Sequence, residues 1–111
     1  MTPYPKPVKR WRASTKQWAR IREQFRGKPC QVCGGKWNSL HHIVPRSQSG
    51  CDVAANLAPL CMTCHDEIHA RNNQIRGKLA ASLTHVQRVY ILNRKGAGWL
   101  EAQYPEWRDA A

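Results

Sequence analysis

The chain has 111 residues, of which 18 are Lys or Arg and 7 are Asp or Glu, so its formal net charge is +11. This length predicts a single domain with a small core, and the excess of positive charge indicates a polyanionic partner such as nucleic acid. Membrane spanning is excluded, because no apolar run approaches the roughly 20 residues that a bilayer requires. The N-terminal sequence also lacks the apolar stretch of a secretory signal, so we expect a cytoplasmic, non-secreted protein.

The N-terminal part of the chain divides into an extended arm and a helix. Residues 1–13 are rich in proline and basic side chains, which predicts a flexible basic arm. A helix is expected from Ser14, because Ser14 and Gln17 have the spacing of a capping box. An apolar stripe at helical intervals continues it, formed by Trp18, Ile21 and Phe25. Gly27 and Pro29 are expected to end it.

The middle of the chain predicts a strand, a loop and a second helix. Residues 39–44 (SLHHIV) are typical of a strand that Pro45 closes, and the polar segment that follows is typical of a turn. Residues 53–60 show little clear period. The second helix is expected from Thr63 to between Ala70 and Asn72.

The C-terminal part predicts further helix and then a tail. Residues 74–93 carry apolar side chains at helical intervals and predict one or two helices, with possible breaks at Gly77 and near Ser82 and Thr84. We take residues 14–95 as the folded domain and residues 96–111, after a glycine-rich hinge, as an aromatic C-terminal tail.

Cysteine spacing predicts a structural metal site. Two CxxC pairs place two thiolates of each pair on one ion, and two such knuckles complete the tetrahedron that Zn²⁺ prefers. An odd cysteine count without a secretory signal argues against a disulfide framework. A redox motif is poorly supported, because there are two pairs and no thioredoxin-like pattern. The expected zinc ligands are Cys30, Cys33, Cys61 and Cys64, with Cys51 left over.

Four histidines indicate a second metal site. His65 and His69 are four residues apart on the second expected helix, so they lie on one helical face. His41 and His42 are neighbours on the expected strand and therefore point to opposite faces. Both can act on one substrate only if the strand ends or twists at that point. Cys64 directly precedes His65, so we expect the zinc site to fix where this helix begins.

These segments together resemble a known motif. The string LHHIVPRSQSG, then Asn56-Leu57, then LCMTCHDEIH, is similar to the HNH endonuclease motif of the ββα-metal nucleases, and the CxxC pairs resemble its zinc-stabilised branch, common among phage and restriction-type enzymes. The resemblance covers about residues 14–72. It implies an α+β fold with a small zinc-stabilised ββα-metal core and flanking helices.

The resemblance also implies roles for the site residues. His42 matches the general base that takes a proton from the attacking water, and Asn56 matches the residue that braces the loop around it. His41, His65 and His69 match the ligands of one catalytic divalent ion. The implied activity is hydrolysis of DNA phosphodiester bonds, leaving 5′-phosphate and 3′-hydroxyl ends.

The identity of the catalytic ion stays open. Many family members have Asp where this chain has His41, and an imidazole set suits softer ions as well, so Mg²⁺, Mn²⁺, Ni²⁺ and Zn²⁺ are all candidates. Some members use only one of the two helix histidines as a ligand. Of the two we favour His69, because His65 adjoins the cysteine knuckle.

Basic side chains are the expected substrate contacts. Arginine forks bind phosphate oxygens in bidentate fashion, and the candidates are Arg46, Arg20, Arg22 and Arg71. No helix-turn-helix or repeated base-reading element is evident, so we expect duplex DNA to be bound with weak sequence preference. An oligomer is possible.

Two other functions remain open at this point. A zinc-ribbon module that binds DNA without catalysis needs only the cysteines and the basic residues, and leaves the histidines unexplained. An accessory subunit of a phage or repair complex could use the aromatic tail for docking. A nuclease would be expected at the nucleoid or in a phage-infected cell.

Overall fold

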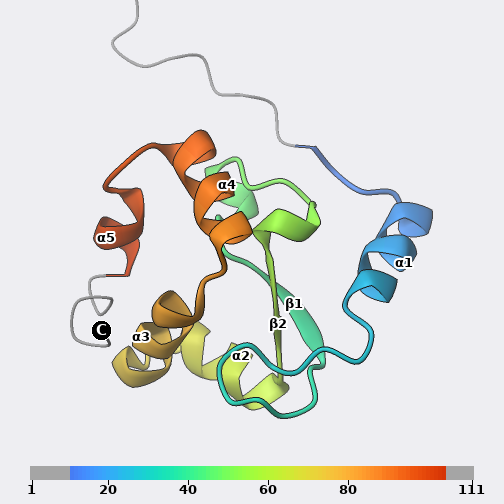
Figure 1. The fold of residues 1–111 in the computed structure, drawn as a ribbon, viewed down its shortest axis with the longest axis horizontal. Coiled ribbons are helices and arrows are strands. Elements are labelled where there is room, and N and C mark those ends of the chain that lie inside the picture. The colour runs from blue at the N-terminus through green and yellow to red at the C-terminus, as the bar shows by residue number, and fades with distance from the viewer. Residues whose placement is uncertain (1–10, 105–111) are drawn as a thin grey trace, which may run out of the picture.

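In a computed structural model, residues 11–104 are described. This part of the chain folds into helices around a two-stranded sheet, which confirms the α+β class (Figure 1). None of its helices is both long and apolar enough to cross a bilayer. The elements in chain order are α1 (Thr15–Gln24), β1 (Ser39–His42), η1 (Arg46–Gln48), η2 (Ala54–Asn56), β2 (Leu57–Leu60), α2 (Met62–His69), α3 (Asn73–Ser82), α4 (His85–Lys95) and α5 (Trp99–Gln103).

The sheet separates two groups of helices. Strands β1 and β2 are antiparallel, with Ser39 opposite Leu60 and His42 opposite Leu57. Figure 1 shows α1 on one side of the strands and α3, α4 and α5 on the other. Since alternate strand residues point to opposite faces, Leu40 packs on the α1 side, whereas Leu60 joins the core on the other side.

Each face of the sheet has its own core. The smaller core joins α1 to the strands and consists of buried Ile21, Phe25 and Leu57 with partly buried neighbours that include Trp18 and Trp37. The larger core fills the space between the sheet and the later helices. Its buried members include Ile43, Val44, Ala58, Leu60, Ile68, Leu79, Leu83, Ile91 and Tyr104.

Helix α1 begins as its sequence predicts. The Ser14 hydroxyl accepts from the Gln17 backbone N–H, and the Gln17 side chain accepts from the Ser14 N–H, so the capping box is complete. These bonds satisfy two of the N–H groups that a helix start leaves without partners. Thr84 and Gln87 form a second capping box at the start of α4.

That second box explains the break in the C-terminal helical stretch. Residues 74–93 form two helices, which separate between Ser82 and His85 as expected, whereas Gly77 lies inside α3 without interrupting it. The first strand is shorter than its predicted range 39–44, ending at His42. Residues 57–60 form β2, which its sequence does not reveal because all four positions are buried and no alternation results.

Two glutamines tie the first cysteine knuckle to α4. The Gln31 and Gln87 side-chain amides donate to each other's oxygens, at 2.8 and 3.0 Å. Gln87 also donates to the Leu57 carbonyl at 3.1 Å, and the Gln31 backbone N–H donates to the Pro59 carbonyl at 2.8 Å. The knuckle, β2 and α4 are therefore linked through buried polar contacts.

The predicted arm and tail fall partly outside the described residues. Of the arm, residues 1–10 lie outside, while Trp11 and Ala13 hydrogen-bond to the loop that contains Asp52. Of the tail, residues 105–111 lie outside. Its first part packs on the domain, because the Trp99 indole N–H donates to Gln48 and Tyr104 is buried.

Candidate functional site

The four cysteines of the CxxC pairs converge. Their sulfur atoms all lie within 4.8 Å of one another, and those of Cys33 and Cys61 are 3.7 Å apart. A tetrahedral Zn²⁺ with Zn–S bonds of about 2.3 Å separates its sulfurs by about 3.8 Å. The cluster formed by Cys30, Cys33, Cys61 and Cys64 could therefore hold a structural zinc.

The cysteine cluster fixes the start of α2. Cys61 is the N-cap residue of this helix, and its sulfur accepts from the Cys64 backbone N–H at 3.4 Å. Burial raises the pKa of Cys30, but backbone N–H groups around it outweigh burial and lower the pKa to about 6. Burial and the neighbouring thiols raise the pKa of Cys64. A cation bound here would favour the thiolate form of all four cysteines and would couple metal binding to the start of α2.

Three histidines form a second cluster. Ligand nitrogens of His41 on β1 and of His65 and His69 on α2 lie within 4.8 Å of one another. The Nε2 atoms of His65 and His69 are 3.0 Å apart, and the His65 Nδ1 lies 2.7 Å from the Ser39 hydroxyl. A hydrogen bond at the outer nitrogen fixes the ring so that the inner nitrogen is available to an ion.

The chemistry of this cluster fits a divalent ion. The His41 Nε2 is buried and has no hydrogen-bond partner among the described residues, which is costly unless an ion or water satisfies it. Burial, with smaller effects from His65 and His69, lowers the pKa of His41 to about 3. Burial and His69 also lower the pKa of His65. The neutral imidazole is the form that ligates metals.

His42 points away from the cluster, toward α1, and binds a carboxylate. Its Nε2 lies 2.8 Å from Oδ1 of Asp52, and its ring meets the edge of the Trp18 ring at a centroid distance of 5.9 Å. A carboxylate only accepts hydrogen bonds, so Nε2 carries the proton of a neutral His42. The other ring nitrogen, Nδ1, then has a lone pair that can accept a proton.

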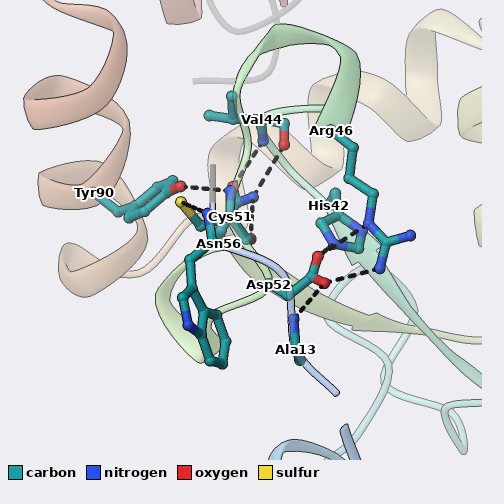
Figure 2. A network of polar contacts seen from close by, with 9 residues as sticks. Ala13, His42, Val44, Arg46, Cys51, Asp52, Asn56 and Tyr90 are labelled. Atoms are coloured by element: carbon teal, nitrogen blue, oxygen red, sulfur yellow. Dashed lines mark hydrogen bonds and ion pairs between the residues drawn. The ribbon is translucent and has the colours of Figure 1, made fainter. Parts of the chain in front are cut away.

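Asp52 connects three parts of the chain at this point. Its side chain is fully buried and accepts from His42, from the Ala13 backbone N–H at 2.9 Å, and from the Arg46 guanidinium at 3.0 Å through both oxygens (Figure 2). Burial raises the pKa of Asp52, but these donors outweigh it and hold the pKa below its usual value. Asp52 is therefore an ionised partner for His42.

Asn56 braces the loop that carries Asp52. Its side-chain oxygen accepts from the Val44 N–H at 2.8 Å, and its amide donates to the carbonyls of Val44 and Cys51 at 3.0 and 3.1 Å. Figure 2 shows these contacts closing the loop beside His42. Asn56 is fully buried, so these bonds replace water entirely.

The same loop has a position that only glycine fits. A Cβ on Gly50 would lie 1.8 Å from the Val44 carbonyl oxygen. Its backbone N–H donates to the Pro45 carbonyl at 2.9 Å, and the next N–H, of Cys51, donates to the Tyr90 hydroxyl at 2.9 Å. The loop is thus packed closely from Val44 to Asn56.

Both strand histidines reach one cavity. A cavity of about 210 Å³ is lined by His41, His42 and His69, together with Arg71 and Arg76. Because β1 ends at His42, neighbours that point to opposite faces can still border the same space. His41 and His42 can therefore contact one substrate, which the sequence allows only if the strand ends or twists at this point.

The predicted substrate contacts occupy different places. Arg71 is exposed at the cavity, Arg46 is paired with Asp52 and lies over the Trp18 ring at 5.6 Å, and Arg22 lies over the Trp37 ring at 5.0 Å. Arg20 is an exposed residue of α1. The structure therefore brings Arg46 and Arg71 to the histidines and leaves Arg20 and Arg22 along α1.

Sequence reasoning missed Asp52. It lies in the segment RSQSGCD, where a polar residue is typical of a turn, and its partners His42 and Ala13 are 10 and 39 residues away. The signal that could have found it is its place in the chain. It follows the histidine pair and precedes Asn56 within the segment that joins β1 to β2.

Comparisons with known proteins agree with this geometry. Residues 30–71 match the family described as HNH endonuclease. The matched segment contains both clusters that could hold a metal ion, and it also contains His42 and Asn56. A mitochondrial DNA mismatch repair protein mutS homolog from Sarcophyton glaucum is 33% identical over 54 residues, which is 43% of this chain and 6% of the relative. No solved structure matches.

Proposed function

We propose that the protein is a metal-dependent endonuclease that hydrolyses DNA phosphodiester bonds, because residues 30–71 match the HNH endonuclease family and contain the converging CxxC pairs. The observation that carries the proposal is the convergence of His41, His65 and His69, together with the one cavity that His41, His42 and His69 line. The cysteine cluster holds a structural zinc, and residues 14–95 are the nuclease domain. The net charge of +11 suits DNA as the partner.

The histidine cluster is the proposed site of one divalent ion. His41, His65 and His69 would hold it, and when bound it supplies Lewis-acid stabilisation of the charge that develops on the phosphate. Imidazole nitrogens are softer ligands than carboxylate oxygens, so Mg²⁺, Mn²⁺, Ni²⁺ and Zn²⁺ are all candidates for this ion.

His42 is the proposed general base. Its Nδ1 takes a proton from water, the water oxygen attacks the phosphorus, and the bond to the 3′ oxygen breaks while that oxygen takes up a proton from solvent. The products carry a 5′-phosphate and a 3′-hydroxyl. A histidine is suited to this step because its usual pKa lies near neutral pH.

Asp52 and Asn56 are proposed to position the base. Asp52 keeps the proton on Nε2 of His42 and stabilises the positive charge that the ring gains when Nδ1 is protonated, as carboxylates do for histidine bases elsewhere. Asn56 holds the loop through three hydrogen bonds, so the carboxylate cannot drift from the ring.

Arginines complete the proposed site by binding phosphate. Arg71 lines the cavity and is free of the Asp52 network, so it is the better-placed contact for the phosphate that is cut. Arg46 also lies beside His42, but Asp52 engages two of its nitrogens. We therefore expect Arg46 mainly to hold Asp52 in place and to contribute less to DNA binding.

The test is cleavage of supercoiled plasmid by the zinc-loaded protein with each of Mg²⁺, Mn²⁺, Ni²⁺ and Zn²⁺ added. We expect nicked or linear product with at least one ion, and a 10²–10⁴-fold lower rate for His42→Ala. The control His85→Ala changes an exposed histidine at the start of α4 and should cut normally.

Metal binding gives a second readout. Calorimetric titration should show one site that His41→Ala loses while the zinc content is kept. If no ion supports cutting, or if His42→Ala cuts as well as the parent, the enzymatic assignment fails. Salt-sensitive DNA binding that persists without cutting would then favour a zinc-ribbon binding module.

A further inference from the structure

A groove separate from the histidine cavity lies between the end of α1 and the first cysteine knuckle. It encloses about 510 Å³ and is lined by the basic side chains of Arg22, Arg26, Lys28 and Lys36, with Trp37 among its other walls. The residues that line the histidine cavity do not line this groove. The groove is therefore a feature separate from the proposed active site.

The groove concentrates positive charge. Its lining holds four cationic side chains and no carboxylate. One of these cations, Arg26, has an acidic partner. Glu23 lies 3.1 Å from it in an exposed ion pair. Exposed pairs of this kind contribute little and are readily exchanged, so the net charge of the groove favours a polyanion.

Aromatic rings hold two of the cations in place. The Arg22 guanidinium lies 5.0 Å from the centre of the Trp37 ring, and the Lys28 ammonium lies 5.6 Å from that of Phe25. A guanidinium stacked on a ring keeps its N–H edge available for phosphate oxygens. Less side-chain entropy is then lost when an anion binds.

The cysteine knuckle forms the other wall of the groove. Pro29 and Lys36 form an isolated antiparallel bridge, so the two ends of the knuckle lie side by side and bring Lys28 and Lys36 to the same opening. The Cys30 N–H donates to the Gly35 carbonyl inside this turn. The geometry of the groove therefore depends on the same cysteines that form the candidate zinc site.

Helix α1 connects the groove to the proposed base. Trp18 contacts His42 and Arg46 near one end of the helix, and Arg22 follows one turn later. Four residues of α-helix correspond to about 6 Å, and the other groove cations, Arg26, Lys28 and Lys36, lie beyond the end of α1 at Gln24. One DNA strand advances about 3.4 Å per nucleotide along the duplex axis, so Arg22 lies about two nucleotides from Trp18 along the helix.

We propose that this groove binds DNA backbone phosphates about two or more nucleotides from the bond that is cut. The cysteine knuckle is then part of the substrate-binding surface as well as a structural support. The inference rests on the proposed function for the position of the cut, whereas the groove's preference for a polyanion follows from its own charges. Contacts of this kind add affinity without reading sequence.

The test compares two double variants with the same change in charge. Lys28→Ala/Lys36→Ala removes two groove cations, and Lys16→Ala/Lys78→Ala removes two exposed lysines elsewhere, on α1 and α3. Binding to a 20-base-pair DNA duplex is measured by fluorescence anisotropy across a salt series, with the zinc-loaded protein and no further ion added. Zinc content and Tm establish that both variants are folded.

We expect the groove variant to lower the slope of log K against log salt by about 2 and to weaken binding at least tenfold, since each lost phosphate contact reduces the slope by about 1. The control variant should change the slope by much less. Equal slopes for the two variants would overturn the proposal. So would a loss seen with an RNA duplex and not with DNA.

Hydrolysis of bis(p-nitrophenyl) phosphate separates the two proposals. This small ester reaches the histidine cavity without touching the groove, so both double variants should hydrolyse it at the parental rate. If the parent hydrolyses neither ester nor plasmid, the nuclease assignment fails, and the salt slopes still decide whether the groove binds DNA. A groove variant that loses ester hydrolysis would contradict the separation of the two sites.

Discussion

The Nε2 atom of His42 lies 2.8 Å from Oδ1 of Asp52, a residue that is itself fully buried. This contact determines which ring nitrogen carries the proton, because an ionised carboxylate only accepts hydrogen bonds. It also joins the histidine to Arg46 and to the Ala13 backbone through the same carboxylate. The chemistry of His42 therefore depends on a carboxylate in the segment between the histidine pair and Asn56.

Replacing Asp52 by Asn should slow DNA cleavage by about 10²–10³-fold with little change in KM, because the proton on His42 is no longer held at Nε2. The measurement is single-turnover cleavage together with ¹⁵N NMR of the His42 ring, which distinguishes the two neutral tautomers. Glu101→Gln makes the same charge change at an exposed site on α5 and should leave both readouts as they are. An unchanged tautomer in the Asp52 variant would contradict the assigned role.

Asp52 should also make stability depend on pH. The pKa of Asp52 is lower in the folded protein than its ordinary value, so its contribution is complete above the unfolded pKa, about 3.9, and is lost as the pH falls through the folded pKa. We expect Asp52→Ala to lose about 2 kcal/mol at pH 7, less than the ~3–5 of a fully buried pair, since the Arg46 side chain is 38% exposed. Urea unfolding at pH 7 and below pH 3 should show the two proteins converging in acid.

Loss of the structural metal should unfold the core around α2. Cys64 is buried in the larger core and bonds through its N–H to the cap residue of α2. We expect Cys64→Ser, or a strong chelator, to remove the zinc and abolish the cooperative thermal transition. Cys51→Ser changes the cysteine outside the cluster and should retain one zinc. Circular dichroism and elemental analysis check both outcomes.

Gly50→Ala should destabilise the protein by about 3 kcal/mol or more, because the added carbon would lie 1.8 Å from the Val44 carbonyl oxygen and the backbone must move. Gly96→Ala is the comparison. Its Cβ meets nothing within 4 Å, and only its φ of +82° resists the change, which costs about 1 kcal/mol. Chemical denaturation of both variants measures the difference between their free energies of unfolding. Equal losses of stability would contradict the close approach of Gly50 to the Val44 carbonyl.

The start of α1 and the convergence of the four paired cysteines could be predicted from the sequence because their signals are local. Ser14 and Gln17 are three residues apart, and the cysteines of each pair are separated by two residues, so the spacing alone constrains the geometry. The HNH resemblance is confirmed by the family match over residues 30–71, and the α+β class by the observed helices and strands. The roles of the site residues stay predictions for the experiments above.

Strand β2 and the partners of Asp52 could not be predicted, because they depend on tertiary contacts. Both faces of β2 are covered, so it shows no alternation, and Pro59 within it argues against a strand. Asp52 gains its partners only when α1's leading segment and the strand end fold onto one loop. Contacts between residues this far apart in the chain leave no local pattern in the sequence.

The paired side chains of Gln31 and Gln87 join the first knuckle to α4, with Leu57 and Pro59 of β2 between them. Elements that share such contacts open together, as one cooperative unit. Amide hydrogens in α4 should thus exchange with solvent at rates that follow zinc occupancy, although the helix carries none of the cysteines. Protease cutting near residue 84 would follow the same dependence, making a distant helix a reporter of the metal.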